Sequence, residues 1–406
     1  MIKAGSIAYA ILICIVVGVF CYALLMISSY SKMHQTMLFT STELHSNNES
    51  AKQYFLSKAN DISQNNSIDL FDNGIVSSAE VKPWGFYQIL VTTSNFKTDT
   101  IRQTVLIGEK QQDDGLALYL TDNNKALFMV GKAIIKGNVF IPKKGIKQGY
   151  ITSNAYTNTK ILLGSKSVSK AQLPELKTTF FKFENQQTER IDLRELSDSI
   201  KYYQSFAEKT LFIDAIETEL LQKKLSGNIV IESKDSLYIK KNNVLDNVIV
   251  KAPKVVFESG FKGSVQVVAD QLVVLEENVI LKYPSGIFIH HGETAHKEIR
   301  LKNSSKLLGA IVLDDQNRSA DKLISIEENV EIVGDVYCSG EIALEGSVIG
   351  TVYTNSFYLR TDASIYDNYI MDGVIDKKNL PDNFLKVSLF NNINKRERKY
   401  AIITPL

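Results

Sequence analysis

Three of the five histidines of this sequence lie within one short segment. His290 and His291 are followed by Glu293 and His296. Imidazole and carboxylate groups at such spacing are the ligands that Zn²⁺ takes in proteins, so the segment carries the chemistry of a metal site. The order of residues is not HExxH, and nothing nearby supplies a positioned fourth ligand. We therefore interpret these side chains as solvated loop residues, with a zinc site as the alternative.

A pair of carboxylates, Asp314 and Asp315, lies close to Arg318. Enzymes that cleave polysaccharides use two carboxyl groups, one as an acid and one as a base or nucleophile. Aspartate is also a common turn residue because its side chain hydrogen-bonds nearby backbone, and we interpret the pair in this way.

A small basic cluster of lysines, at 143, 144 and 147, lies in a glycine-rich stretch that contains neither GKS/GKT nor GxGxxG. This stretch is therefore not a phosphate-binding loop, and a solvated corner accounts for it better than an anion-binding patch. The sequence thus predicts no catalytic residue, no metal site and no cofactor.

The charge balance excludes one large class of partners. The 46 Lys and Arg residues meet 45 Asp and Glu residues in a chain of 406. A net charge of +1 gives no basic face for nucleic acid. Only Cys338 lies outside the apolar N-terminal segment, which excludes a disulfide scaffold and a zinc site of four thiolates.

The elements that must position these residues begin with an apolar segment, Ile7 to Ile27, of 21 residues without a charge. A helix of this length spans about 30 Å, the thickness of the hydrocarbon layer of a bilayer. We predict a retained membrane anchor. A cleaved signal peptide is the alternative, although its apolar core is usually shorter and the segment from Ser28 to Ser31 matches a cleavage site poorly.

The positive-inside rule places Lys3 in the cytoplasm, although Lys32 and His34 follow the helix. We therefore expect a single-pass protein of the inner (cytoplasmic) membrane with its C-terminal bulk periplasmic or extracellular. The expected partners are the lipid bilayer, through Ile7 to Ile27, and other envelope proteins.

The start of the chain, Lys3-Ala4-Gly5-Ser6 before the apolar run, resembles the leader of type IV minor pilins. The resemblance covers about thirty residues. It implies processing between Gly5 and Ser6 and packing of the helix with other hydrophobic helices. The chain departs from the pattern at Ala10, where major pilins carry a glutamate. The alternative is that Gly5 and Ser6 only begin a membrane helix, since serine is a good N-cap.

Beyond the anchor, polar residues around spaced apolar ones predict a juxtamembrane helix or stalk up to about residue 70. Short runs such as Trp84 to Thr92 alternate in the manner of strands. In the segment from 193 to 225, Leu196, Ile200, Tyr203 and Phe206 follow a 3–4 spacing, which predicts helix. We interpret this part as a helical insertion on a β body.

The C-terminal region contains an internal repeat. Segments that open at Leu237, Val255 and Leu272 follow one another at intervals of 18 and 17 residues, and each carries two alternating apolar stretches. The pattern returns at Ile324 and Ile342, again 18 residues apart, and the tripeptide Glu-Asn-Val occurs in both stretches. Strands repeating at this period predict a parallel β-solenoid with three short faces per coil. The region resembles the solenoid of bactofilins, which are polymer-forming cytoskeletal proteins. A sandwich of irregular strands is the alternative.

The predicted fold class is mainly β: an N-terminal transmembrane helix followed by a β-rich ectodomain with a parallel β-solenoid and a short helical insertion. The expected segments are an anchor (1–30), a stalk (31–70), a β-rich domain (71–152), a partly helical insertion (153–226), a solenoid (227–376) and a tail (377–406). The expected function is a non-enzymatic structural or assembly role in the envelope, as a minor-pilin-like or secretion-apparatus component. A tethered polysaccharide-binding or polysaccharide-cleaving β-helix and a self-assembling scaffold are the alternatives.

Overall fold

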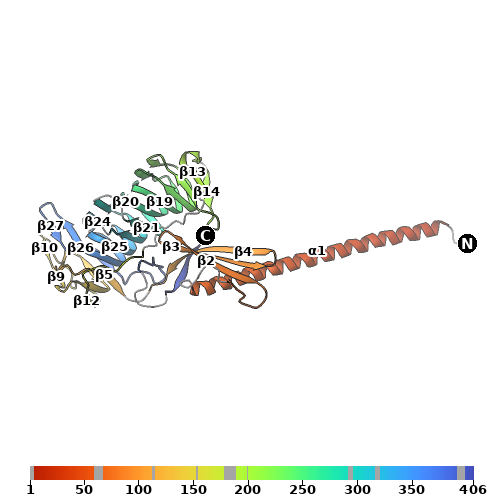
Figure 1. The fold of residues 1–406 in the computed structure, drawn as a ribbon, viewed down its shortest axis with the longest axis horizontal. Helices are drawn as coiled ribbons and strands as arrows, with labels where there is room; N and C mark the ends of the chain where they lie inside the picture. Colours follow the sequence, from red (N-terminus) through yellow and green to blue (C-terminus); the bar gives the residue numbers. More distant parts are fainter. Residues whose placement is uncertain are drawn as a thin grey trace. The chain divides into compact units, whose positions relative to one another are not determined.

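A computed structural model describes residues 4–58, 67–111, 115–151, 154–177, 189–198, 200–290, 296–315, 321–390 and 398–406. The chain divides into two compact units. The first comprises Met1–Glu80 and Thr92–Gln103, and the second comprises Val81–Val91 and Thr104–Leu406. The described chain is mainly β with one long N-terminal helix (Figure 1).

The first unit begins with helix α1, Ala4–Ser57, which continues without a break past Ser28. Within the described residues it is the one helix long and apolar enough to cross a membrane. The side chains of its apolar segment are solvent-exposed, from Ile7 (57%) to Ile27 (66%). The predicted span is therefore helical, and among the described residues none covers its apolar surface.

The C-terminal part of α1 is buried within the first unit through Leu44, Ala51 and Phe55. Between them lies Asn48, which is fully buried and whose amide donates to Ser94 Oγ at 3.0 Å and accepts from Thr92 Oγ1 at 3.1 Å. Buried polar groups are stable where they are paired in this way, so the helix end is fixed by both packing and hydrogen bonds.

An antiparallel sheet follows in the order β1-β2-β3-β4-β30. Its strands are β1 (Ser67–Ile68), β2 (Val76–Trp84), β3 (Tyr87–Phe96), β4 (Asp99–Glu109) and β30 (Tyr400–Pro405).

Most of the second unit is built from parallel strands. In chain order they are β5 (Leu116–Leu120), β6 (Leu127–Val130), β7 (Ile134–Lys136), β8 (Asn138–Ile141), β9 (Ile146–Gln148), β12 (Lys166–Val168), β13 (Glu189–Asp192), β14 (Lys201–Gln204), β15 (Leu211–Asp214), β16 (Glu219–Leu220), β17 (Lys224–Glu232), β18 (Leu237–Ile239), β19 (Val244–Phe257), β20 (Lys262–Leu275), β21 (Ile280–Ile289), β22 (His296–Leu301), β23 (Lys306–Leu313), β24 (Asp321–Ile326), β25 (Glu331–Leu344), β26 (Ser347–Arg360), β28 (Tyr369–Met371) and β29 (Val374–Asp376). Two antiparallel pairings, β10 (Tyr150–Ile151) with β11 (Asn154–Ala155) and β27 (Ile365–Asp367) with β26, accompany them.

Strands β6, β9 and β28 form a separate parallel sheet in the order β28-β6-β9. The other parallel strands pair in three rows, and the chain passes through the rows in turn. We call one such passage a circuit. Row A runs β13-β15-β17-β19-β20-β21-β23-β25-β26-β5-β8-β12. Row B runs β16-β18-β19-β20-β22-β24-β25-β26, and row C runs β14-β17-β19-β20-β21-β23-β25-β26-β29-β7. Long strands such as β19 and β25 bend from one row into another.

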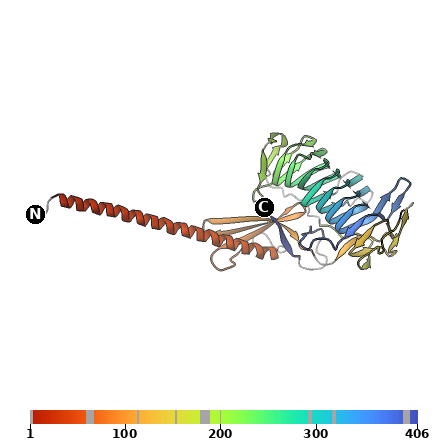
Figure 2. The same ribbon diagram turned by 180° about the vertical axis from the view of Figure 1, so that it is seen from behind.

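The order of circuits differs from the order of the chain. Strand β5 pairs with β26 through Leu118 and Val352, so the early strands lie next to the last circuit. The chain begins again at the opposite end of the stack with β13. Figure 2 shows this arrangement: the gold strands of residues 116–168 lie beside the blue strands of β26, and the green strands form the far end.

The core lies inside the rows. Ile213, Ile231, Val250 and Val267 are partners in row A, and each is fully buried. Of the alternate residues of the same strands, Phe212, Val230 and Ile249 are buried as well, because apolar side chains of other segments pack against the outer face of row A. Parallel strands covered on both faces read as continuous apolar runs, as these do.

The repeated tripeptide Glu-Asn-Val marks equivalent turns. Asn278 and Asn329 have φ values of 60° and 58°, and the valines that follow them, Val279 and Val330, are buried. Asparagine tolerates this left-handed conformation better than most residues. Ile324 is the partner of Ile342 in row B, so the 18-residue spacing of that pair is one circuit.

The predicted helix over 193–225 is wrong. The described residues of this segment form a short 3₁₀ helix, η1 (Leu193–Glu195), and strands β14 to β17. The 3–4 spacing does not mark one buried face, because Leu196 and Phe206 are buried whereas Ile200 (52%) and Tyr203 (60%) are exposed. Parallel pairing with later strands outweighs the local helical preference.

Part of the outer face of row A is covered by the turn between β2 and β3. The ring of Trp84, the one tryptophan, lies 5.0 Å from that of Phe206 in an edge-on arrangement. The backbone N–H of Phe86 donates to Gln266 Oε1 at 2.7 Å. These contacts hold residues 81–91 on the strands of their own unit.

Candidate functional site

The leader positions lie at the start of α1. Gly5 is exposed, and no side chain approaches it within 4 Å. Ser6 belongs to the same helix, and its side chain lies outside the described residues. Processing between them stays a prediction.

The histidine and aspartate clusters converge on one part of the second unit. His290 follows β21, where its ring stacks on that of Phe288 at 5.2 Å, and His296 begins β22. His291, Glu293 and Arg318 lie outside the described residues. Among the residues that the structure describes, no group of three or more His, Cys, Asp or Glu side chains is placed to hold a metal ion. The three lysines at 143, 144 and 147 are exposed.

A cleft of about 1010 Å³ opens where row A passes into row B. It is lined by residues of four successive circuits together with residues 171–173. The polar side chains that face it include His296, Asp314, Asp321, Lys322, Glu341 and Asn355, and Tyr358 adds an aromatic ring.

The cleft lies where the circuits are longest. Between rows A and B, β21 ends at Ile289 before β22 begins at His296, and β23 ends at Leu313 before β24 begins at Asp321. In the next circuits β25 and β26 continue through this corner without a break.

A buried ion pair lies at the floor of the cleft. Lys297 Nζ lies 3.2 Å from Asp315 Oδ2, and both side chains are fully buried. Lys297 also donates to the carbonyl of His290 at 3.2 Å. Lys322 donates to the carbonyl of Asp315 at 2.9 Å, and the N–H of Asp315 donates to Ser339 Oγ at 3.0 Å. A buried charge needs such partners, so these bonds fix the backbone of three circuits relative to one another.

Two carboxyl groups of the cleft are perturbed. Burial raises the pKa of Asp314 above its usual value, and the neighbouring Asp315 acts in the same direction. Burial also raises the pKa of Glu341, with the charges of Asp367 and Asp321 adding to the effect. Perturbed acids in a cleft are typical of binding or catalytic sites, although structural ion pairs perturb acids too.

No known protein family, curated protein or solved structure matches this chain. The cleft is therefore interpreted from its own residues. The sequence singled out Asp314, Asp315 and the histidines, and Tyr358 as one of the aromatic residues of a polysaccharide-binding alternative. It missed Asp321, Glu341 and Asn355, which lie in otherwise regular strands. The sequence feature that indicates the position of the cleft is the interruption of the 17–18-residue spacing between Leu272 and Ile324.

Outward aromatic rings stack on one another in row A. The rings of Tyr337, Tyr353, Tyr119 and Phe140 follow at 6.3, 6.3 and 5.6 Å. Residues of the segment from 170 to 176 cover part of this stack, since Tyr337 donates to the carbonyl of Pro174 and Tyr119 to that of Gln172. Only Phe140 reaches 37% exposure, so the stack belongs to the core rather than to an open groove.

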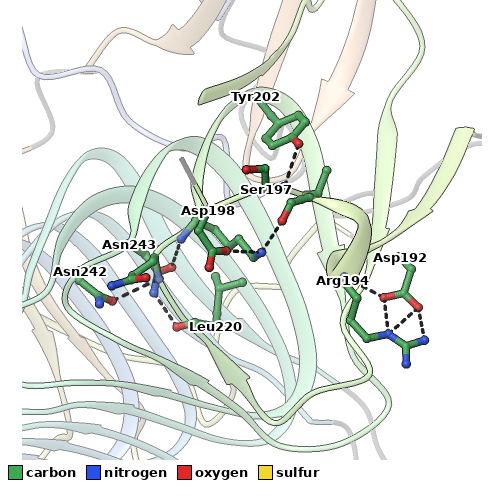
Figure 3. A network of polar contacts seen from close by, with 11 residues as sticks. Asp192, Arg194, Ser197, Asp198, Tyr202, Leu220, Asn242 and Asn243 are labelled. Atoms are coloured by element: carbon green, nitrogen blue, oxygen red, sulfur yellow. Dashed lines mark hydrogen bonds and ion pairs between the residues drawn. The ribbon is translucent and has the colours of Figure 1, made fainter. Parts of the chain in front are cut away.

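The first circuit is closed by a polar network (Figure 3). Lys223 Nζ donates to the carbonyl of Leu196 and to Asp198 Oδ1, both at 2.6 Å, and the N–H of Ser197 donates to the Tyr202 hydroxyl at 2.9 Å. The side-chain amide of Asn243 donates a hydrogen bond to the carbonyl of Leu220 at 2.6 Å. Leu193 and Leu196 are buried with the main core. The core is thereby covered at this end.

Proposed function

We propose that this chain is a single-pass envelope protein with a non-enzymatic structural or assembly role. The observation that carries the proposal is α1, whose apolar segment is exposed while its C-terminal part is packed in the first unit. An exposed apolar helix surface of this length is stable in a bilayer and unfavourable in water. The proposed topology has the N-terminus in the cytoplasm and the body periplasmic or extracellular.

We further infer that the three rows form a β-solenoid. Twelve strands follow one another in row A, all in parallel register, and the inward residues of the three rows share one core. Stacked repeats of this kind make rigid, elongated bodies, which suits a spacer or a docking component.

A minor-pilin-like or secretion-apparatus role is the sharper form of the proposal. It is supported by the Gly5-Ser6 start and by the continuity of the apolar helix with the first unit. In such a role α1 packs beside the helices of other envelope proteins.

The anchor is tested by placing charges in it. Val16→Arg combined with Val17→Arg is expected to release the protein from membranes, because each arginine at mid-bilayer costs about 2.5–3.5 kcal/mol on insertion scales. The measurement is the share of protein that resists carbonate extraction. Met33→Arg with Met37→Arg is the matched control, since both residues are exposed on α1 beyond Ile27. Retention of the Val16/Val17 variant in the membrane, equal to that of the control, would contradict the proposal.

A further inference from the structure

The cleft between rows A and B runs across successive circuits. Asp321, Glu341 and Asn355 lie on three neighbouring strands, β24, β25 and β26, and Asp314 follows the end of β23. These polar side chains are not in register, because the partners of Glu341 are Leu323 and Ser356. Neighbouring strands are about 4.8 Å apart, so a linear polymer laid along the stack meets polar groups of several circuits.

The polar groups of this cleft suit hydroxyl-rich ligands. Carboxylates accept hydrogen bonds, and the amide of Asn355 and the hydroxyl of Ser339 both donate and accept. Tyr358 adds a half-buried ring, and an aromatic face packs well against the apolar face of a sugar. A cleft with a few convergent polar groups and an apolar surface is the usual form of a small-molecule or oligomer site.

The charge of the cleft selects among such ligands. Asp314, Asp321 and Glu341 line it together with one lysine, Lys322. The other nearby cation, Lys297, is fully buried against Asp315. The excess of carboxylates repels anionic polymers and attracts ammonium groups.

We infer that this cleft binds a glycan chain of neutral or amino sugars, with Tyr358 against a ring face and Asp321 and Glu341 accepting hydrogen bonds from hydroxyl or ammonium groups. The inference does not depend on the anchor, because every residue of the cleft belongs to the second unit. It adds a ligand to the structural role proposed above.

The test is calorimetric titration of the full chain in lipid nanodiscs. The probes are a glucosamine tetramer, cellotetraose, tetragalacturonate and a tetralysine peptide. The glucosamine tetramer is expected to bind most tightly and cellotetraose detectably, with tetragalacturonate weakest at low salt. Empty nanodiscs measure binding to lipid.

Variants connect the binding to the cleft. Tyr358→Ala is expected to weaken both sugar tetramers about fivefold or more, the effect of losing an aromatic contact. Tyr238→Ala is the matched control, because Tyr238 lies on β18 of row B, 45% exposed and away from the cleft, and should leave binding unchanged. Asp321→Asn preserves shape at an exposed position and is expected to weaken the glucosamine tetramer about fivefold while sparing cellotetraose.

Three results would overturn the inference. They are tightest binding of tetragalacturonate, binding of tetralysine alone, and sugar binding that neither Tyr358→Ala nor Asp321→Asn alters. Asp321→Asn replaces one carboxylate oxygen by an amide group and keeps the shape of the side chain. It therefore tests whether the cleft binds the sugar even if Tyr358→Ala unfolds the protein.

Discussion

Replacing Asp315 by alanine is expected to lower the free energy of unfolding by about 3–5 kcal/mol, because the Lys297 ammonium then stays buried without its carboxylate. Both side chains are fully buried, and Lys297 Nζ lies 3.2 Å from Asp315 Oδ2. Denaturant unfolding of the full chain in detergent, followed by the fluorescence of Trp84, measures the change. Trp84 is suited to this because it is the single tryptophan and is buried in the second unit.

Two controls isolate the cause of the Asp315 effect. Lys125→Ala removes an exposed ion pair with Asp367, at 2.7 Å, and is expected to cost less than about 1 kcal/mol. Lys297→Met combined with Asp315→Leu removes both charges and is expected to recover much of the lost stability, as apolar replacements of buried pairs do. A loss in the double variant as large as in Asp315→Ala would show that packing, rather than the unpaired charge, causes the effect.

Gly334→Ala is expected to destabilise the second unit by more than about 4 kcal/mol. Gly334 pairs with Gly309 and Gly350 in row C and has a φ of +133°. A Cβ atom there would lie 1.7 Å from the carbonyl oxygen of Gly309, so the backbone of two circuits would have to separate.

Gly260→Ala is the matched control for Gly334. Gly260 has a φ of +81°, but a Cβ atom there meets nothing within 4 Å. The substitution should lower the free energy of unfolding only by the strain of a left-handed backbone at alanine, about 1–2 kcal/mol. Equal losses in the two variants would mean that close stacking of circuits does not set the requirement for glycine at 334. The same unfolding measurement serves both.

The apolar helix and the period of the C-terminal strands could be predicted from the sequence because both depend on local pattern. A run of 21 residues without a charge predicts a long apolar helix from local composition alone. The partner of Ile324 in row B is Ile342, so the 18-residue spacing that the repeat indicated is one circuit.

Other features depend on contacts distant in the sequence. No period in the sequence connects Leu118 with Val352, so the pairing of β5 with β26 could not be predicted. The helix expected over 193–225 followed from apolar spacing alone, whereas Ile213 is held in place by its partner Ile231. The cleft likewise joins residues from separate circuits, and only Asp314 and Asp315 formed a visible local pair.

The most direct test of the central claim is the intact mass and N-terminal sequence of the native protein extracted from membranes. A retained anchor predicts a chain that starts at Met1, or at Ser6 after processing of the pilin-like leader, with Ile7 to Ile27 present in either case. A start beyond Ser28 would show that the helix is a cleaved signal, and it would contradict the proposal of a membrane-anchored protein.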